Sequence, residues 1–361
     1  MKIVFISSAF YPSIGGVQTH ALEVARELVK LGHTVSVITE DKQTGEESDN
    51  EAKNIKSIDK STFFTHKKLY QIDIFYFKFG QAGFFKKFRI WFLIFLNRKL
   101  FLDAEIIHCH DVFFWYLPFR FLYPQKKVFT TFHGYETVFP PQKKAIQIRK
   151  WSEKLSYGNI CVGNFISRWY GTKPDYVVYG GVKPESSMKY SVFRKKGSIL
   201  NTRHRILLIG RLEKDIGILL YRDALRILKE KGVKFKLTIC GDGTLRQELE
   251  PYGEVVGFQD KLQKYIDKAD EVFASSYLTL FQVMQLGKPA FAVYTNPLKH
   301  DYLKDSPFGK YITISGSADE LAKKIMRNTP NQRLLQQGKN WANKQTWESV
   351  AKIYLELWNK K

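Results

Sequence analysis

The sequence predicts an α/β protein of two domains, each built on a doubly wound parallel sheet. At 361 residues the chain exceeds the usual size of a single domain. Apolar strand-like runs alternate with helix-period stretches up to residue 162, the pattern lapses between residues 183 and 204, and it then begins again. The alternation predicts parallel strands with helices on both sheet faces, and the restart predicts a second domain of the same kind.

The chain opens with a strand, a loop that contains two glycines, and a helix. The strand is expected at 3–6, the loop ends in Gly15 and Gly16, the helix covers 17–31, and a second strand follows at 34–39. Glycine lets the backbone approach a bound group closely, and a helix N-terminus presents unpaired N–H donors. We therefore expect Gly15 and Gly16 to form an anion-binding crevice, and the alternative is a plain tight turn.

The other elements of the first half follow the same alternation. Residues 41–68 are polar without a steady period and are predicted to form a long loop. Strands are expected at 72–77, 105–109, 128–132 and 159–162, and helices at 84–101, 112–122 and 143–155.

The second half is predicted to repeat this architecture. Strands are expected at 205–209, 235–240, 271–274, 290–294 and 311–314, and helices at 217–231, 280–286 and 346–358. The predicted domains are 1–185 and 186–345, with the C-terminal helix of 346–361 packing back on the first. Because ligands of such sheets bind at the carboxyl ends of the strands, we expect the active site in a cleft between the domains.

Charge and cysteine usage limit the partners and the compartment. The formal net charge of +22 favours a phosphorylated substrate, an acidic lipid or a nucleic acid, and a general solubility bias is the alternative. No nucleic-acid-binding motif is found, so we expect no nucleic-acid partner. Cys109, Cys161 and Cys240 each lie in an apolar run, which predicts buried thiols in the reducing cytoplasm. The longest apolar run, 90–96, is too short to span a bilayer.

Several segments together resemble glycosyltransferase family 4. They are residues 8–17, 131–134, 179–182, 210–217, 241–243, 282–289 and, more loosely, 347–354. The resemblance implies the GT-B architecture of two Rossmann-like domains and transfer of a sugar from a nucleotide-diphosphate donor, with retention at the anomeric carbon. It also implies a glycan or lipid-linked acceptor, no metal ion and no further cofactor.

The resemblance assigns roles to residues near the donor phosphates. Gly15 and Gly16 would donate backbone N–H groups to the phosphates. Arg211 would offset the charge that develops on the leaving diphosphate, which suits a guanidinium because its donors match phosphate oxygens, whereas the alternative is a surface arginine. Where the family has a second cation, this chain has Ile216, and Lys214 is the nearby candidate to replace it.

A second departure concerns the family's two glutamates, whose positions hold Ala274 and Gln282. Gln282 would accept a hydrogen bond from the donor's ribose as a neutral group, at a loss of about 1 kcal/mol against a carboxylate. Leu278, Thr279 and Leu280 would offer backbone N–H groups at the start of the following helix. Ser275 and Ser276 are alternatively helix caps.

The resemblance places His133 near the transferred sugar. Its imidazole would hold a sugar hydroxyl or support deprotonation of the acceptor, and a purely structural histidine is the alternative. His108 and His110 flank Cys109, but no further ligand completes a metal site, so we expect none. His110 and Asp111 are expected to contribute to the acceptor site.

Residues 84–101 combine five basic side chains with large apolar ones and contain no acidic residue. This composition suits a helix on an anionic membrane surface, at the inner face of the membrane. We favour an ordinary helix that covers the sheet. Two other functions are weighed: a nucleotide-sugar epimerase, for which no persuasive acid and base residues are found, and a non-catalytic descendant that acts as a binding or scaffold protein.

Overall fold

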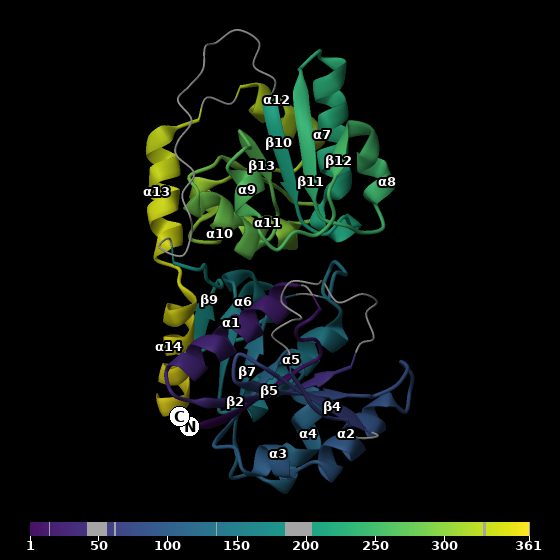
Figure 1. Ribbon diagram of the computed structural model, residues 1–361, viewed down its shortest axis with the longest axis vertical. Coiled ribbons are helices and arrows are strands. Elements are labelled where there is room, and N and C mark those ends of the chain that lie inside the picture. The colour runs from purple at the N-terminus through teal and green to yellow at the C-terminus, as the bar shows by residue number, and fades with distance from the viewer. Residues whose placement is uncertain are drawn as a thin grey trace. The chain divides into compact units, whose positions relative to one another are not determined.

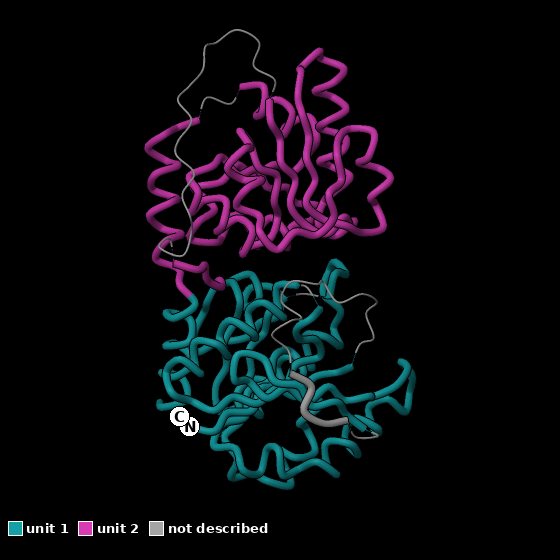
Figure 2. Tube along the Cα trace, viewed as in Figure 1, with its two compact units in different colours: residues 1–178, 347–361 teal, residues 179–346 magenta. Residues whose placement is uncertain are grey.

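The computed structural model describes residues 1–13, 15–41, 56–60, 63–134, 136–184, 204–327 and 330–360, and for 56–60 the backbone alone. The chain divides into two compact units (Figure 2). Unit 1 comprises residues 1–178 and 347–361, and unit 2 comprises 179–346. The division lies a few residues before the predicted boundary at 185/186, and the last helix belongs to unit 1.

Unit 1 is built on a nine-stranded sheet of order β3-β4-β5-β2-β1-β6-β7-β8-β9. The strands from β5 to β9 in this order pair in parallel, whereas β3, β4 and β5 pair antiparallel. The strands are β1 Lys2–Ser7, β2 Thr34–Glu40, β3 Lys56–Lys60, β4 Phe64–Leu69, β5 Ile72–Phe77, β6 Ile106–His110, β7 Lys127–Phe132, β8 Gly158–Val162 and β9 Tyr176–Val178.

The prediction of a long loop at 41–68 is wrong, because β3 and β4 lie within it or overlap its end. These two strands form the edge of the sheet, and all but one of the β4 residues remain partly exposed. Edge strands carry charged side chains that protect them from pairing with other chains. Lys67 and Lys68 therefore mask the apolar alternation by which a strand is recognised. Residues 42–55 and 61–62 lie outside the described residues.

Helices cover both faces of this sheet (Figure 1). They are α1 Gly16–Lys30, α2 Lys86–Leu96, α3 Lys99–Leu102, α4 Phe113–Leu122, α5 Lys143–Leu155, α6 Asn164–Tyr170 and α14 Trp347–Lys360. The single helix predicted at 84–101 is two helices, since α2 ends at Leu96 and its C-cap residue, Asn97, donates from its side chain to Leu93 O at 2.8 Å. Alternating strand residues such as Val4 and Ile107 pack against α2 and α4, and the opposite face carries α1 and α14.

Unit 2 is built on a six-stranded, fully parallel sheet of order β12-β11-β10-β13-β14-β15. Its strands are β10 His204–Ile209, β11 Phe235–Cys240, β12 Gly253–Val255, β13 Glu271–Phe273, β14 Ala290–Val293 and β15 Thr313–Ser315. Its helices are η3 Lys214–Ile216, α7 Ile218–Glu230, α8 Arg246–Leu249, η4 Glu250–Tyr252, α9 Gln263–Ile266, α10 Tyr277–Gln285, α11 Pro297–Lys304, η5 Gly309–Tyr311, α12 Ala318–Met326 and α13 Gln332–Asn343.

Helices α7 and α12 pack together in unit 2, as do α10 and α13 (Figure 1). The prediction of two doubly wound α/β domains is therefore confirmed. Cys109, Cys161 and Cys240 are buried free thiols, as expected. No helix in the described part of the chain is both long and apolar enough to cross a membrane.

Candidate active site

Three neighbouring strands of unit 2, β10, β13 and β14, end at one edge of the sheet because they run in parallel. The segments that follow them are 210–217, 274–276 and 294–296. Doubly wound sheets bind ligands at this edge. The residues that the sequence assigns to the donor therefore start from one edge of one sheet.

Arg211 is the second residue after β10 and follows Gly210. Its side chain is half exposed. Its guanidinium donates to Asp215 Oδ2 at 3.0 Å. Lys214 is exposed in the short helix η3, and Ile216 at the end of that helix is partly buried. The turn after β10 thus presents Arg211 and Lys214 to solvent, with the Glu213 carboxylate between them in sequence and Asp215 directly after them.

The loops after β10 and β11 hold each other in place. A Cβ on Gly241 would lie 1.8 Å from Gly210 O, so only glycine permits this approach of the two strand ends. Glu213 accepts hydrogen bonds from the Thr244 backbone N–H at 3.0 Å and from the Thr244 hydroxyl at 2.7 Å. These contacts fix the turn that carries Arg211.

Lys299 is a further cation at this edge, and the sequence analysis missed it. It lies in the first turn of α11, where Asn296 caps the helix by accepting a hydrogen bond from Lys299 N at 2.9 Å. Its side chain is buried, and desolvation lowers its pKa to about 8, opposed by the Asp215 carboxylate and assisted by the Arg211 guanidinium. The strand before it and Asn296-Pro297, a helix-start signal, could have placed it here.

The start of α10 offers two backbone donors rather than three. Tyr277 N donates to the Tyr302 hydroxyl at 3.0 Å, and Leu280 N donates to Ser276 O at 2.9 Å. In the part of the chain that the structure describes, the N–H groups of Leu278 and Thr279 have no partner. Leu280 is therefore not one of the free backbone donors expected for the donor sugar nucleotide, because its N–H is hydrogen-bonded within the helix and its side chain is buried.

The two serines before α10 do not cap it through their side chains. Ser276 is at the N-cap position but makes no side-chain capping bond, and its hydroxyl donates to Thr279 Oγ1 at 2.8 Å. Ser275 is buried, where its hydroxyl pairs with that of Tyr221 at 2.8 Å. Ala274 is also buried and contributes no polar side chain at the first glutamate position.

Gln282 lies in the second turn of α10 and is half-buried. Its side-chain amide makes no hydrogen bond to any described residue, so its carbonyl oxygen remains available as an acceptor. This is the property that the predicted ribose contact requires.

In unit 1, the first βα turn leads directly into α1. Gly15 is the N-cap residue, and Gly16 is exposed, with no atom within 4 Å of the position that a Cβ would take. The first turn contains no acidic side chain and no side-chain cap. The N-terminus of α1 therefore keeps the donors and partial positive charge that an anion would use. Ile14 lies outside the described residues.

His133 follows β7 and is held by its neighbours. Its backbone N–H donates to Asp111 Oδ1 at 3.0 Å, and its Nε2 is 2.8 Å from His110 Nδ1. The loop after it is fastened by the buried Arg149, which donates to Gly134 O and, at 2.9 Å, to Glu136 Oε1. Arg149 comes from the middle of α5, which the sequence predicts as a helix without indicating this contact.

The protons on this histidine pair follow from burial. Desolvation lowers the pKa of both imidazoles well below 6.5, so both rings are neutral. His110 Nε2 is buried and has no partner among the described residues, which disfavours an N–H there. His110 therefore donates from Nδ1 to His133 Nε2, and the proton of His133 lies on Nδ1. His133 presents this N–H from a half-buried position.

His110 is fully buried, so the expectation that it contributes to the acceptor site is wrong. Side chains alternate between the two faces along β6, and that of His110 lies on the face covered by α1 and α14, where it contacts His133 and not solvent. Asp111 is exposed and has a left-handed φ of 61°, which Asp tolerates better than most residues.

A second hydrogen-bonded chain joins α14 to α1 on the same face. Trp358 Nε1 donates to His108 Nδ1 at 3.1 Å, which leaves the proton of neutral His108 on Nε2, 2.7 Å from Thr131 Oγ1. Thr131 Oγ1 is 2.8 Å from the Tyr354 hydroxyl, which is 3.0 Å from His20 Nε2. Every donor has an acceptor if each group donates to the next one along this chain, from Trp358 through to His20 Nε2. Four histidines are therefore part of the hydrogen-bonded packing of unit 1.

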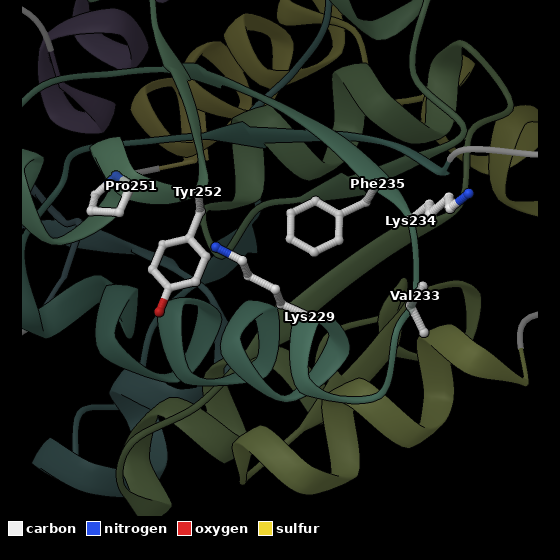
Figure 3. Close-up of a pocket in the computed structure, with 6 residues that line it drawn as sticks. All are labelled: Lys229, Val233, Lys234, Phe235, Pro251 and Tyr252. Atoms are coloured by element: carbon white, nitrogen blue, oxygen red, sulfur yellow. The ribbon is translucent and has the colours of Figure 1, made fainter.

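Among the described residues, no group of three or more His, Cys, Asp or Glu side chains could hold a metal ion. A pocket of about 340 Å³ lies elsewhere in unit 2, around the start of β11 (Figure 3). It is lined by Lys229, Val233, Lys234, Phe235, Pro251 and Tyr252. These residues lie near the amino end of β11, away from the strand ends that carry Arg211, so this pocket is not the candidate donor site.

Family models confirm the resemblance. The model described as Glycosyltransferase Family 4 matches residues 14–186, and the model described as Glycosyl transferases group 1 matches residues 203–329. The chain belongs to glycosyltransferase family 4. No curated protein sequence matches this glycosyltransferase.

Solved structures of low sequence identity share its fold. The catalytic domain of starch synthase IV from Arabidopsis thaliana, bound to ADP and acarbose, has a TM-score of 0.67 at 16% identity, covering 99% of this chain and 98% of that one. Sucrose-phosphate synthase from Thermosynechococcus elongatus has a TM-score of 0.69 at 15% identity, with coverages of 99% and 98%. A TarM variant from S. aureus, in complex with Fondaparinux, α-GlcNAc-glycerol and UDP, has a TM-score of 0.62 at 14% identity, with coverages of 99% and 100%. The GT-B fold is thus confirmed.

Proposed function

We propose that this glycosyltransferase moves a sugar from a nucleotide-diphosphate donor to a glycan or lipid-linked acceptor, with retention and without a metal ion. The observation that supports it best is the positive charge at the carboxyl edge of the unit 2 sheet. Arg211 and Lys299 both act on Asp215, and Leu278 and Thr279 add two unpaired N–H groups there. Such an edge can accept a diphosphate.

Metal independence rests on the charges that the protein itself supplies. Arg211, Lys214 and Lys299 would offset the negative charge that grows on the diphosphate as the glycosidic bond breaks. Gly15 and Gly16, at the uncapped N-terminus of α1, are proposed as further backbone donors to phosphate. Lys299 would take the place of the family cation whose position holds Ile216.

His133 is proposed to hold a hydroxyl of the transferred sugar. Its proton lies on Nδ1, so the imidazole acts as a donor and not as a base in this arrangement. Gln282 is proposed to accept a hydrogen bond from the ribose. Retention is proposed from the family to which the chain belongs.

The place of action is proposed to be the cytoplasm, at the inner face of a membrane where the acceptor is lipid-linked. The buried free thiols of all three cysteines suit a reducing compartment. The net charge of +22 suits an anionic membrane as a partner.

The proposal is tested by titrating a panel of UDP-, ADP- and GDP-sugars while following thermal unfolding. A catalyst should be stabilised by one donor, by about 2.7 kcal/mol at a concentration 100 times Kd. The same donor should yield free nucleoside diphosphate when an acceptor extract is added. A protein that responds to no donor would instead be the non-catalytic scaffold, which the replacements at Ile216, Ala274 and Gln282 keep as the second candidate.

A matched pair of arginine variants distinguishes a role in donor binding from the general effect of removing an exposed arginine. Arg211 is 51% exposed and pairs with the carboxylate four residues later, and Arg226 on α7 is 53% exposed and pairs with Glu230 in the same spacing. Arg211→Ala should abolish the response to the donor, whereas Arg226→Ala should keep it. Equal responses would contradict the assigned site.

A further inference from the structure

Helix α2 is apolar on two opposite faces. Its inner face buries Ile90, Leu93 and Ile94 in the core of unit 1. On its outer face Phe88, Phe92 and Phe95 are 47, 59 and 42% exposed, and their spacing of four and three residues places them in one line. The interpretation of 84–101 as an ordinary helix that covers the sheet accounts only for the inner face. A helix that is apolar all round is normally buried.

Three more exposed residues extend this line. Phe84 and Phe85 in the turn before α2 are 72 and 71% exposed, and Leu96 at its end is 46% exposed. We call Phe84, Phe85, Phe88, Phe92, Phe95 and Leu96 the outer stripe. Large exposed apolar patches on soluble domains mark interaction surfaces. Trp91 Nε1 donates to Phe114 O of α4 at 3.0 Å, so the stripe is presented on a supported helix.

Cations flank the outer stripe. Lys87 Nζ lies 4.9 Å from the ring centres of both Phe84 and Phe88, and the Arg98 guanidinium lies 4.8 Å from that of Phe95. Arg89 and Lys99 are also exposed, and no acidic residue occurs in 84–101. A helix with aromatic residues on one face and lysine and arginine beside them is typical of the boundary between lipid headgroups and acyl chains.

The positive charge beside the outer stripe indicates which partner binds this surface. A second copy of the chain docked stripe to stripe would bring two sets of these cations together without an acidic partner from the segment. Anionic headgroups would neutralise the same cations, while the alkyl stems let lysine and arginine reach them from beside the inserted rings. The charges therefore favour a lipid surface over a copy of this protein.

We propose that the outer stripe inserts into the interface of an anionic membrane, with α2 lying in the membrane plane and its cations among the headgroups. This proposal deepens the proposed function, since it names the surface by which the enzyme would reach a lipid-linked acceptor. Membrane binding itself requires no donor and no transfer, so it is measured separately from them.

The stripe is tested by flotation of the full chain with vesicles. Wild type should bind vesicles of phosphatidylcholine and phosphatidylglycerol in equal amounts, and should not bind phosphatidylcholine alone. The triple variant Phe88→Ala, Phe92→Ala, Phe95→Ala should bind roughly 100-fold more weakly, because three rings no longer leave water. The control Trp151→Ala, Phe258→Ala removes side chains that are 66 and 49% exposed elsewhere, and should bind as wild type.

The cations are tested in the same assay. Arg98→Gln, Lys99→Gln should weaken binding roughly 30-fold at low salt, at about fivefold per cation, and the effect should shrink as salt rises. The control Lys229→Gln, Lys231→Gln neutralises two exposed lysines of unit 2 and should leave binding unchanged. Every substituted side chain is at least 42% exposed or lies on the surface, so thermal unfolding should change little, and melting curves of each variant show whether misfolding explains a loss of binding.

Three results would overturn the proposal. Wild type could fail to float with anionic vesicles, the triple variant could float as well as wild type, or light scattering could show a dimer that the triple variant dissociates. A protein that binds a sugar nucleotide but no vesicle would refute the membrane surface and leave the proposed function standing. A protein that binds vesicles but no sugar nucleotide would leave the membrane surface standing and refute the proposed function.

Discussion

Acidification should destabilise unit 1 through its buried histidines, and His20 gives the magnitude. Burial lowers the pKa of His20 to about 3, whereas the imidazole of an unfolded chain has a pKa of about 6.5. Below pH 6.5 the unfolded state therefore binds a proton that the folded state does not. Stability is lost as the pH falls from 6.5 towards 3, and it is fully present above 6.5.

Between pH 7 and pH 5 this single group should lower the free energy of unfolding by about 2 kcal/mol. The folded state cannot take up the proton cheaply because His20 Nε2 accepts from the Tyr354 hydroxyl inside a fully buried cluster. Burial lowers the pKa values of His108, His110 and His133 in the same direction, so the total loss in wild type should exceed the share of His20.

The assay is urea unfolding at pH 7 and pH 5, followed by circular dichroism. His20→Gln keeps an acceptor for Tyr354 but removes the titrating group, so its pH difference should be smaller than that of wild type by about 2 kcal/mol. The control His300→Gln changes a histidine that is one-third exposed in unit 2 and should keep the wild-type difference. Equal pH differences in wild type and His20→Gln would refute this account of the cluster.

Three predictions concern the donor site. Arg211→Ala should lower kcat roughly 100-fold or more with an unchanged fold, since the side chain is half exposed, and steady-state kinetics with circular dichroism check it. Gln282→Glu should tighten nucleotide binding several-fold in calorimetry, because a charged acceptor replaces a neutral one, and weaker binding would count against the ribose contact. Lys299→Gln should weaken binding and remove an uptake of about half a proton at pH 8, measured in buffers of different ionisation enthalpy, because an anion raises its pKa from about 8.

The fold could be predicted because its core strands carry either continuous apolar runs, as in β10, or apolar residues that alternate with polar ones, as in β11. Residues 235–240 read as a strand from sequence and are β11, and 143–155 read as a helix and are α5. The errors occur where tertiary context overrides the local pattern. Strand β4 is polar because it lies near an exposed edge, and the helix at 84–101 breaks where the Asn97 side chain bonds back to Leu93 O.

The candidate site could be predicted only where a motif carries its residues in one segment. His133 directly follows β7 and Arg211 follows β10 after one glycine, so the sequence places both at strand ends. Arg149 and Lys299 come from α5 and α11, and the contacts that matter to them depend on how separate segments pack. The burial of His110 and the hydrogen bond of Leu280 N were likewise properties of packing and not of residue type.

The position of Lys299 changes what Ile216 means for activity. From sequence, Ile216 removes one of two phosphate-binding cations and favours a non-catalytic descendant. In the structure Asp215 faces charge from both Arg211 and Lys299, and the Glu213 carboxylate also interacts with Arg211, so this edge keeps two cations beside two carboxylates. Burying a lysine costs desolvation, and the Asp215 carboxylate and the Tyr302 ring, whose centre lies 4.9 Å from Lys299 Nζ, offset part of that cost. Lys299 is therefore the proposed replacement for the cation that is missing at residue 216, and the Lys299→Gln variant tests whether the site depends on it.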